Sequence, residues 1–122
     1  MAKILVVDDE IQIRDMLTQI LTRAGHEVEL AEDGVIAMDK FRASPAELII
    51  TDLMMANKNG LELIQEITRE FGEIRVIAIS GGVPTCPSDY YLSVAKLMGA
   101  SRILDKPFTK DELLEAVDVT MS

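Results

Sequence analysis

The sequence is poor in the residue types from which disulfide frameworks, cysteine metal sites and histidine-based catalytic sites are built. It contains one cysteine, one histidine and no tryptophan in 122 residues. The lone cysteine, Cys86, excludes an internal disulfide framework and a metal site built from cysteines. No apolar run approaches the roughly eighteen residues that cross a bilayer, and residues 4–7 are too short for the core of a signal peptide. We therefore expect a cytoplasmic chain without membrane contact.

Basic residues are also scarce, and no basic patch stands out. The chain has 12 Lys and Arg against 21 Asp and Glu, which gives a formal net charge of −9 at pH 7. This charge repels the phosphates of DNA and RNA, so direct nucleic-acid binding is not expected. A surplus of carboxylates can instead collect at one place and bind a hard cation through oxygen. The acidic residues are thus the first candidates for a site.

Short apolar runs predict the strands of one α/β domain over residues 1–122. Continuous runs are typical of strands covered on both faces, whereas an alternating segment is typical of an edge strand. The continuous runs are residues 4–7, 48–51, 76–79 and 103–104, and the alternating one is 27–30. The intervals between them carry helical patterns, and this alternation predicts a parallel sheet with helices on both faces.

The helical intervals show apolar residues at the three-and-four spacing of one helix face. The clearest face consists of Ile13, Met16, Leu17, Ile20, Leu21 and Ala24. Similar patterns occupy residues 37–41, 63–71 and 113–117, and a further helix is expected from about Ser88. Thr109 with Glu112 resembles a capping pair at a helix start, and Gly25 and Gly72 are suited to helix ends.

Polar residues that directly follow the predicted strands are the candidate site, because ligands of such sheets bind beyond the carboxyl ends of the strands. They are Asp8, Asp9 and Glu10, then Asp52, Ser80, Lys106 and Pro107. Taken singly, each aspartate could be a helix cap or a turn residue. Gathered on one rim, the carboxylates would repel one another, and Mg²⁺, with Mn²⁺ as an alternative, would remove that conflict.

The same group of residues suits phosphoryl chemistry. Lys106 offers a fixed positive charge and Ser80 a hydroxyl donor for phosphoryl oxygens. No histidine or cysteine base is needed, because phosphoryl transfer depends mainly on positioning and charge neutralisation, and an aspartate can be the nucleophile.

These motifs together resemble the receiver domain of response regulators over the whole chain. The similar segments are residues 4–10, Asp52 to Met55 with Gly60, Ser80, Gly99-Ala100 and Lys106-Pro107-Phe108. The resemblance implies a flavodoxin-like, doubly wound (βα)5 three-layer sandwich with strand order 2-1-3-4-5. It also implies a phospho-acceptor switch of a two-component phosphorelay, which catalyses only its own phosphorylation and dephosphorylation and is not otherwise an enzyme.

The resemblance also assigns roles to individual residues. Asp52 would receive a phosphoryl group from a histidine kinase, a phosphotransfer protein or a small phosphodonor. Mg²⁺ would be held by Asp8, Asp9, Asp52 and the backbone carbonyl of Met54. Ser80 and Lys106 would contact the phosphoryl group, and a cis peptide bond before Pro107 would aim Lys106 inward.

The sequence departs from the family pattern at several positions. Ile103 stands at the switch position where Tyr or Phe is usual, so the signal cannot pass by rotation of an aromatic ring. Ala56 replaces a common proline, and residues 81–87 form a longer loop than usual. Met54 and Gly82 cannot orient an attacking water with a polar side chain, which predicts slow self-dephosphorylation.

Several functions stay open at this point. If no effector domain follows Ser122, we expect protein targets to read the face of the fourth helix, fifth strand and last helix of a monomer or weak dimer. The alternatives are a receiver fragment of a longer response regulator and a pseudo-receiver interaction module. An aspartyl-phosphate phosphatase is less favoured, because Met54 stands where such enzymes usually carry a second acid.

Overall fold

A parallel sheet forms the centre of the molecule. The computed structural model describes residues 2–53, 60–80 and 102–122. Its elements in chain order are β1 (Lys3–Val7), α1 (Ile11–Arg23), β2 (Glu27–Ala31), α2 (Gly34–Ala43), β3 (Leu48–Asp52), α3 (Gly60–Phe71), β4 (Arg75–Ser80), β5 (Arg102–Asp105) and α5 (Lys110–Met121). The strand order is β2-β1-β3-β4-β5, and every neighbouring pair is parallel. The predicted fold class and strand order are confirmed.

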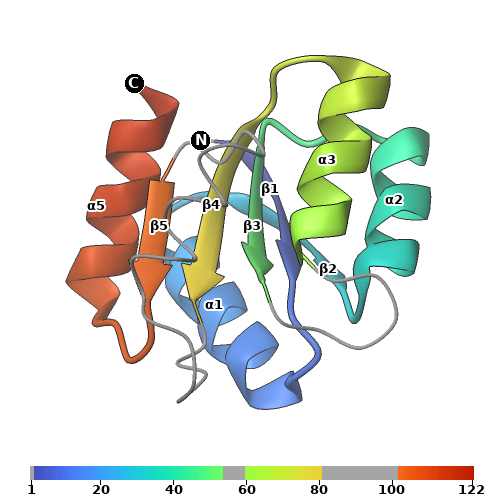
Figure 1. Ribbon diagram of the computed structural model, residues 1–122. Helices are drawn as coiled ribbons and strands as arrows, with labels where there is room; N and C mark the ends of the chain where they lie inside the picture. Colours follow the sequence, from blue (N-terminus) through green and yellow to red (C-terminus); the bar gives the residue numbers. More distant parts are fainter. Residues whose placement is uncertain (1, 54–59, 81–101) are drawn as a thin grey trace.

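The strands send alternate side chains into two apolar layers. Leu5 and Ile49 point to the layer covered by α2 and α3, whereas Ile4 and Ile50 point to the layer covered by α1 and α5. This alternation follows from the two-residue period of an extended strand. Figure 1 shows α2 and α3 together on one side of the sheet and α5 on the other. The three-layer arrangement is therefore confirmed for the described residues.

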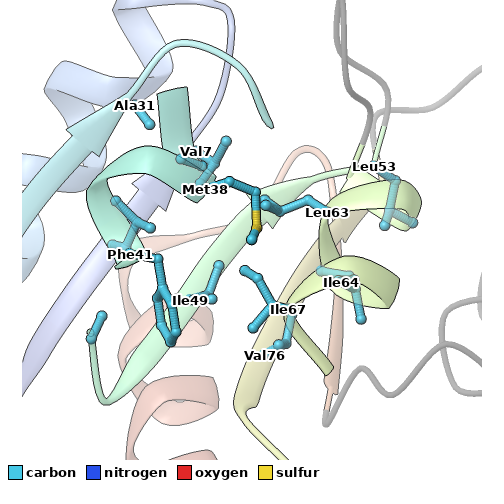
Figure 2. Close-up of a cluster of buried hydrophobic side chains, with 14 residues drawn as sticks. Val7, Ala31, Met38, Phe41, Ile49, Leu53, Leu63, Ile64, Ile67 and Val76 are labelled. Carbon is cyan, nitrogen blue, oxygen red and sulfur yellow. The ribbon is translucent and has the colours of Figure 1, made fainter. Parts of the chain in front are cut away.

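The layer between the sheet and the α2–α3 pair fixes the position of α3. Figure 2 shows Met38 and Phe41 of α2 beside Ile49 of β3, with Leu63 and Ile67 of α3 in the same cluster. Each of these side chains is at most 1% exposed. Full burial of such a side chain contributes about 1.5–3 kcal/mol. The packing thereby holds the first turn of α3 close to the end of β3.

The prediction of core positions was wrong for two residues of the α1 segment, Met16 and Ala24. Leu17 and Leu21 are fully buried, but Met16 is 36% exposed. One residue advances an α-helix by about 100°, which carries Met16 to the margin of the stripe that Leu17 centres. Ala24 is exposed because the helix has already ended there, and Ala24 is its C-cap. The apolar stripe is narrower and shorter than the three-and-four spacing predicted.

Phe71, expected on the core face of α3, is also partly exposed, at 39%. It is the last residue of its helix, and its ring packs edge-on against Phe41 with ring centroids 4.9 Å apart. At this last position of α3, its ring is less covered than the buried side chains earlier in the helix. The prediction was right that Phe71 packs in the α2–α3 layer, but wrong that its side chain is buried.

The predicted helix boundaries are confirmed where they fall in the described residues. Thr109 and Glu112 form a reciprocal capping box at the start of α5. Gly25 and Gly72 follow α1 and α3 with φ of 94° and 84°, a backbone region that glycine occupies without strain. The helix expected from Ser88 lies outside the described residues. None of the helices in the described part is long and apolar enough to cross a membrane.

Candidate functional site

Three strand ends bring the central charged residues of the site together. Asp8 directly follows β1, Asp52 is the last residue of β3, and Lys106 directly follows β5. Since all the strands are parallel, their carboxyl ends meet at one edge of the sheet, which is the lower edge in Figure 1. The backbone N–H of Asp8 donates to the carbonyl of Ala31 at 3.2 Å, so the β1–β2 pairing continues into the site.

Asp8 and Asp52 are buried carboxylates. Asp8 is 0% exposed and Asp52 is 3% exposed. Burial raises the pKa of Asp8 from 3.8 to about 6; the Glu10 backbone N–H opposes the rise, and the nearby charge of Asp52 adds to it. A carboxylate removed from water is expensive unless a cation or hydrogen-bond donors compensate it. The ionised form of Asp8 is therefore energetically unfavourable in the folded protein near neutral pH.

Lys106 partly offsets this charge. Its Nζ atom lies 3.0 Å from Asp52 Oδ2, 3.6 Å from Asp8 Oδ2 and 3.8 Å from Glu10 Oε1. Partial burial by itself lowers the pKa of Lys106, but the hydrogen bond and charge of Asp52, with the charges of Asp8 and Glu10, raise it overall. Lys106 therefore stays protonated beside the buried aspartates. The peptide bond between Lys106 and Pro107 is cis.

The loop after β1 carries the donor set for a cation. One carboxylate oxygen each from Asp8, Asp9 and Glu10 lies within 4.8 Å of the others. Asp8 Oδ1 accepts the Glu10 backbone N–H at 2.9 Å, whereas Asp8 Oδ2 is buried and accepts no hydrogen bond within the described residues. This buried oxygen lies beside two further carboxylates and has no hydrogen-bond donor among the described residues. Such a group of oxygens fits a hard divalent ion such as Mg²⁺. The residues present are therefore compatible with the predicted metal.

Gly60 is packed against the backbone that carries Asp52. Its N–H donates to the carbonyl of Leu53 at 3.1 Å. A Cβ atom on Gly60 would overlap the backbone oxygen of Asp52 and lie 2.8 Å from Leu53 Cα. Leu53 is tied in turn to β4, because its N–H donates to the carbonyl of Ile79 at 3.1 Å. Only glycine lets the start of α3 approach the end of β3 this closely.

The structure brings together some of the predicted site residues and leaves others outside its description. Asp8, Asp52 and Lys106 are in contact through the lysine, and exposed Asp9 lies beside Asp8. Ser80 ends β4, one residue after the register partner of Asp52. The side chain of Ser80 lies outside the described part, as do residues 54 and 82.

The switch position on β5 is described. Ile103 is partly buried and packs against the apolar cluster beneath α2 and α3. Its register partner is Ala78 of β4. A branched aliphatic side chain in this place fills space in the core layer and has no ring to rotate.

Two residues near the site carried no assigned role in the sequence analysis. Glu10 contributes both to the acidic cluster and to the surroundings of Lys106. Arg14 donates from Nη1 to the backbone carbonyl of Asp8 at 2.7 Å. The position of Glu10 next to Asp9 in the sequence already indicated that it could join the acidic cluster. Nothing in the residue spacing predicted that the Arg14 side chain folds back toward the loop after β1.

Comparison with known proteins decides the family. The family model described as "Response regulator receiver domain" matches residues 4–118. The chain belongs to the response regulator receiver family. Among solved structures, the chain is similar to the chemotaxis protein CheY4 of Vibrio cholerae, with a TM-score of 0.89 and 32% identity over 98% of each chain. The receiver domain of NtrX from Brucella abortus gives a TM-score of 0.87, with 32% identity over 97% of each chain.

Curated relatives of this receiver domain include longer proteins. It is 36% identical to the response regulator ArlR of Staphylococcus epidermidis, over 96% of this chain and 51% of that protein. It is 35% identical to the DNA-binding transcriptional regulator NtrC of Azospirillum brasilense, over 96% of this chain and 24% of that protein. The chain thus spans between about a quarter and a half of these relatives, which it matches as a receiver domain of two-component response regulators.

Proposed function

We propose that this receiver domain is a phospho-acceptor switch in which Asp52 takes up a phosphoryl group. The observation that carries the proposal is the contact of the Lys106 ammonium, 3.0 Å from Asp52 Oδ2, at an edge where buried Asp8 adds a second carboxylate. A buried carboxylate with a fixed cation beside it is suited to nucleophilic attack on phosphorus. Membership of the receiver family supports the same role.

The transfer itself needs little from the protein beyond position and charge. A carboxylate oxygen of Asp52 forms a bond to phosphorus, the bond between phosphorus and the donor nitrogen or oxygen breaks, and its electron pair leaves with the donor. Lys106 neutralises charge on the phosphoryl oxygens. Outside this step on its own side chain, and hydrolysis of the aspartyl phosphate to the free carboxylate and inorganic phosphate, we propose no enzymatic activity.

The carboxylates of Asp8 and Asp9, with Asp52, would hold Mg²⁺, and Glu10 lies close enough to Asp8 and Asp9 to add an oxygen. The ion would supply neutralisation of the negative charge that gathers when a phosphoryl group joins the carboxylates. The buried Asp8 Oδ2, which accepts no hydrogen bond from the described residues and has Lys106 Nζ only at 3.6 Å, supports this assignment. Met54, whose carbonyl was expected to contribute, lies outside them.

The partners we propose are a sensor histidine kinase or phosphotransfer protein as donor and a protein target as reader, in the cytoplasm. The reading face would include β5 and α5, together with the predicted helix that begins near Ser88. Ile103 would transmit the change by packing rather than by ring rotation. Slow self-dephosphorylation, inferred from Met54 and Gly82, stays a prediction.

Mass spectrometry of the intact protein tests the proposal. Wild type incubated with phosphoramidate or acetyl phosphate and Mg²⁺ should gain the mass of one phosphoryl group, and should gain none when EDTA removes the metal. Asp52→Asn should gain none under either condition. Asp39→Asn is the matched control, because the Asp39 side chain is 76% exposed on α2, and it should be phosphorylated like wild type.

The result also separates the alternative functions. A wild-type protein that gains no phosphate with either donor would contradict the switch and favour a pseudo-receiver. Rapid release of inorganic phosphate over many turnovers from a phosphomonoester would favour a phosphatase instead.

A further inference from the structure

Arg14 occupies a place that local helix chemistry does not favour. It lies in the first turn of α1, which begins at Ile11, and a cation there faces the positive end of the helix dipole. The N-cap residue Glu10 makes no side-chain capping bond, and the first turn contains no acidic residue. A sequence that breaks a local preference at a functional edge points to a specific compensating contact.

That contact is the hydrogen bond from Arg14 Nη1 to the backbone carbonyl of Asp8, at 2.7 Å. The same loop is held by the Asp8 N–H on the Ala31 carbonyl at 3.2 Å and by the Glu10 N–H on Asp8 Oδ1 at 2.9 Å. These bonds fix both the peptide plane after Asp8 and the rotamer of its carboxylate. The bond from Arg14 is the one of these three that is donated by a side chain of a helix; the other two are donated by backbone N–H groups.

We propose that Arg14 is a positioning residue for the cation site. By holding the Asp8 carbonyl, it fixes the peptide plane between Asp8 and Asp9 and so sets where the carboxylates of Asp9 and Glu10 stand relative to Asp8. This inference rests on the proposed function, because it assumes that the acidic loop binds Mg²⁺. It adds a residue outside the ligand set and outside the phosphoryl contacts.

Two effects of Arg14 on a bound cation have opposite signs, and this makes the inference testable. As a positive charge near the loop, Arg14 repels Mg²⁺, so its removal would tighten binding. As a positioning residue it orders the ligands, so its removal would weaken binding. Loss of a residue that orients metal ligands typically lowers metal affinity by about 10- to 100-fold. The partly exposed charge is screened by salt, so positioning should decide the sign.

Isothermal titration with MgCl₂ at neutral pH measures that sign. Arg14→Ala should raise the Mg²⁺ dissociation constant by about tenfold. Arg14→Lys keeps the charge but loses the planar fork, so its constant should fall between those of wild type and Arg14→Ala. Arg23→Ala is the matched control: it removes the same charge from the exposed last turn of α1, and it should change the constant by less than about twofold, in the tightening direction.

A second readout distinguishes positioning from general loss of structure. The initial rate of phosphorylation by phosphoramidate is measured against Mg²⁺ concentration, with a thermal melt confirming that each variant is folded at the assay temperature. For Arg14→Ala, the half-saturating Mg²⁺ concentration should rise about tenfold, while the plateau rate stays within about twofold of wild type. A merely structural defect would lower the plateau and leave half-saturation unchanged.

The outcomes separate this inference from the proposed function. An unchanged or tighter Mg²⁺ dissociation constant for Arg14→Ala would overturn the positioning role, even if wild type binds Mg²⁺ and is phosphorylated. Wild type that neither binds Mg²⁺ nor takes up phosphate would overturn the proposed function itself. If Arg14→Ala does not fold, Arg14→Lys decides: a severalfold weaker affinity supports the role, and wild-type affinity contradicts it.

Discussion

At the amino-terminal edge of the sheet, His26 Nδ1 accepts the Ala2 N–H at 3.1 Å and Lys3 Nζ donates to the Ser44 carbonyl at 3.1 Å. At the carboxyl-terminal edge, by contrast, Asp8 is fully buried, its Oδ2 accepts no hydrogen bond from the described residues, and its pKa is raised. These polar groups at the first edge find partners within the chain. The second edge keeps buried carboxylates, Asp8 and Asp52, that repel each other, and a bound cation or phosphoryl group would change this repulsion. Such a loss of stability is expected at a functional site.

The largest expected effect on stability comes from the crowded carboxyl-terminal edge. Gly60→Ala places a Cβ against the backbone of Asp52 and Leu53, so the free energy of unfolding should fall by about 3 kcal/mol or more. Gly72→Ala at the opposite edge meets nothing within 4 Å but has a φ of +84°, so it should lose only about 1–2 kcal/mol. Urea unfolding followed by circular dichroism compares the two. Equal losses would contradict the close packing at the site.

Asp8→Asn should stabilise the protein in the absence of divalent metal. The rise in the pKa of Asp8 from 3.8 to about 6 corresponds to roughly 2–3 kcal/mol of unfavourable charge in the folded state at neutral pH. Asp15→Asn, an exposed position on α1, should change the free energy of unfolding by less than about 0.5 kcal/mol. Urea unfolding in EDTA at pH 7.5 measures both. A destabilised Asp8→Asn would show that the buried charge is compensated.

The effect of Mg²⁺ on stability should depend on pH. Because the folded state raises the pKa of Asp8 from 3.8 to about 6, this group's stabilising contribution is complete below about pH 4 and is lost as pH rises through 6. Mg²⁺ requires the ionised carboxylate, so it should raise the melting temperature clearly at pH 7.5 and little at pH 5. Thermal melts with MgCl₂ or EDTA at both pH values test this. An equal Mg²⁺ shift at pH 5 would place the ion elsewhere.

The smallest effect is expected at the amino-terminal edge. His26→Ala removes the acceptor of the Ala2 N–H and should lower the free energy of unfolding by about 1 kcal/mol. Mg²⁺ affinity and phosphorylation should stay at wild-type values, because the change lies at the edge opposite the site. Urea unfolding and the titration with MgCl₂ measure the two properties. Weakened Mg²⁺ binding in this variant would show that the two edges are coupled.

The sequence predicted the fold well because its signals are local and repeated. Continuous apolar runs such as residues 48–51 marked strands buried on both faces, and Thr109 with Glu112 marked a helix start. It predicted less well how deep a side chain lies. Met16 matched the helical period but stands at the margin of the contact, a property that depends on how the whole helix sits on the sheet.

The site was predicted as a set of residue types after strand ends, with roles supplied by the family resemblance. That rule brought Asp8, Asp52 and Lys106 to one edge, because parallel strands end together. It could not find Arg14, whose bond to the Asp8 carbonyl depends on a side chain folding back over one helical turn. Nor could it show that Gly60 touches the Asp52 backbone, since such contacts are set by the packing of α3.

The most direct test of the central claim is to locate the phosphoryl group on the chain. Wild type treated with phosphoramidate and Mg²⁺ is reduced with borohydride, which converts an aspartyl phosphate to homoserine, and is then mapped by peptide mass spectrometry. Homoserine at position 52 and at no other aspartate is the predicted result. Homoserine at Asp8 or Asp9, or none in a protein that had gained phosphate, would contradict the account.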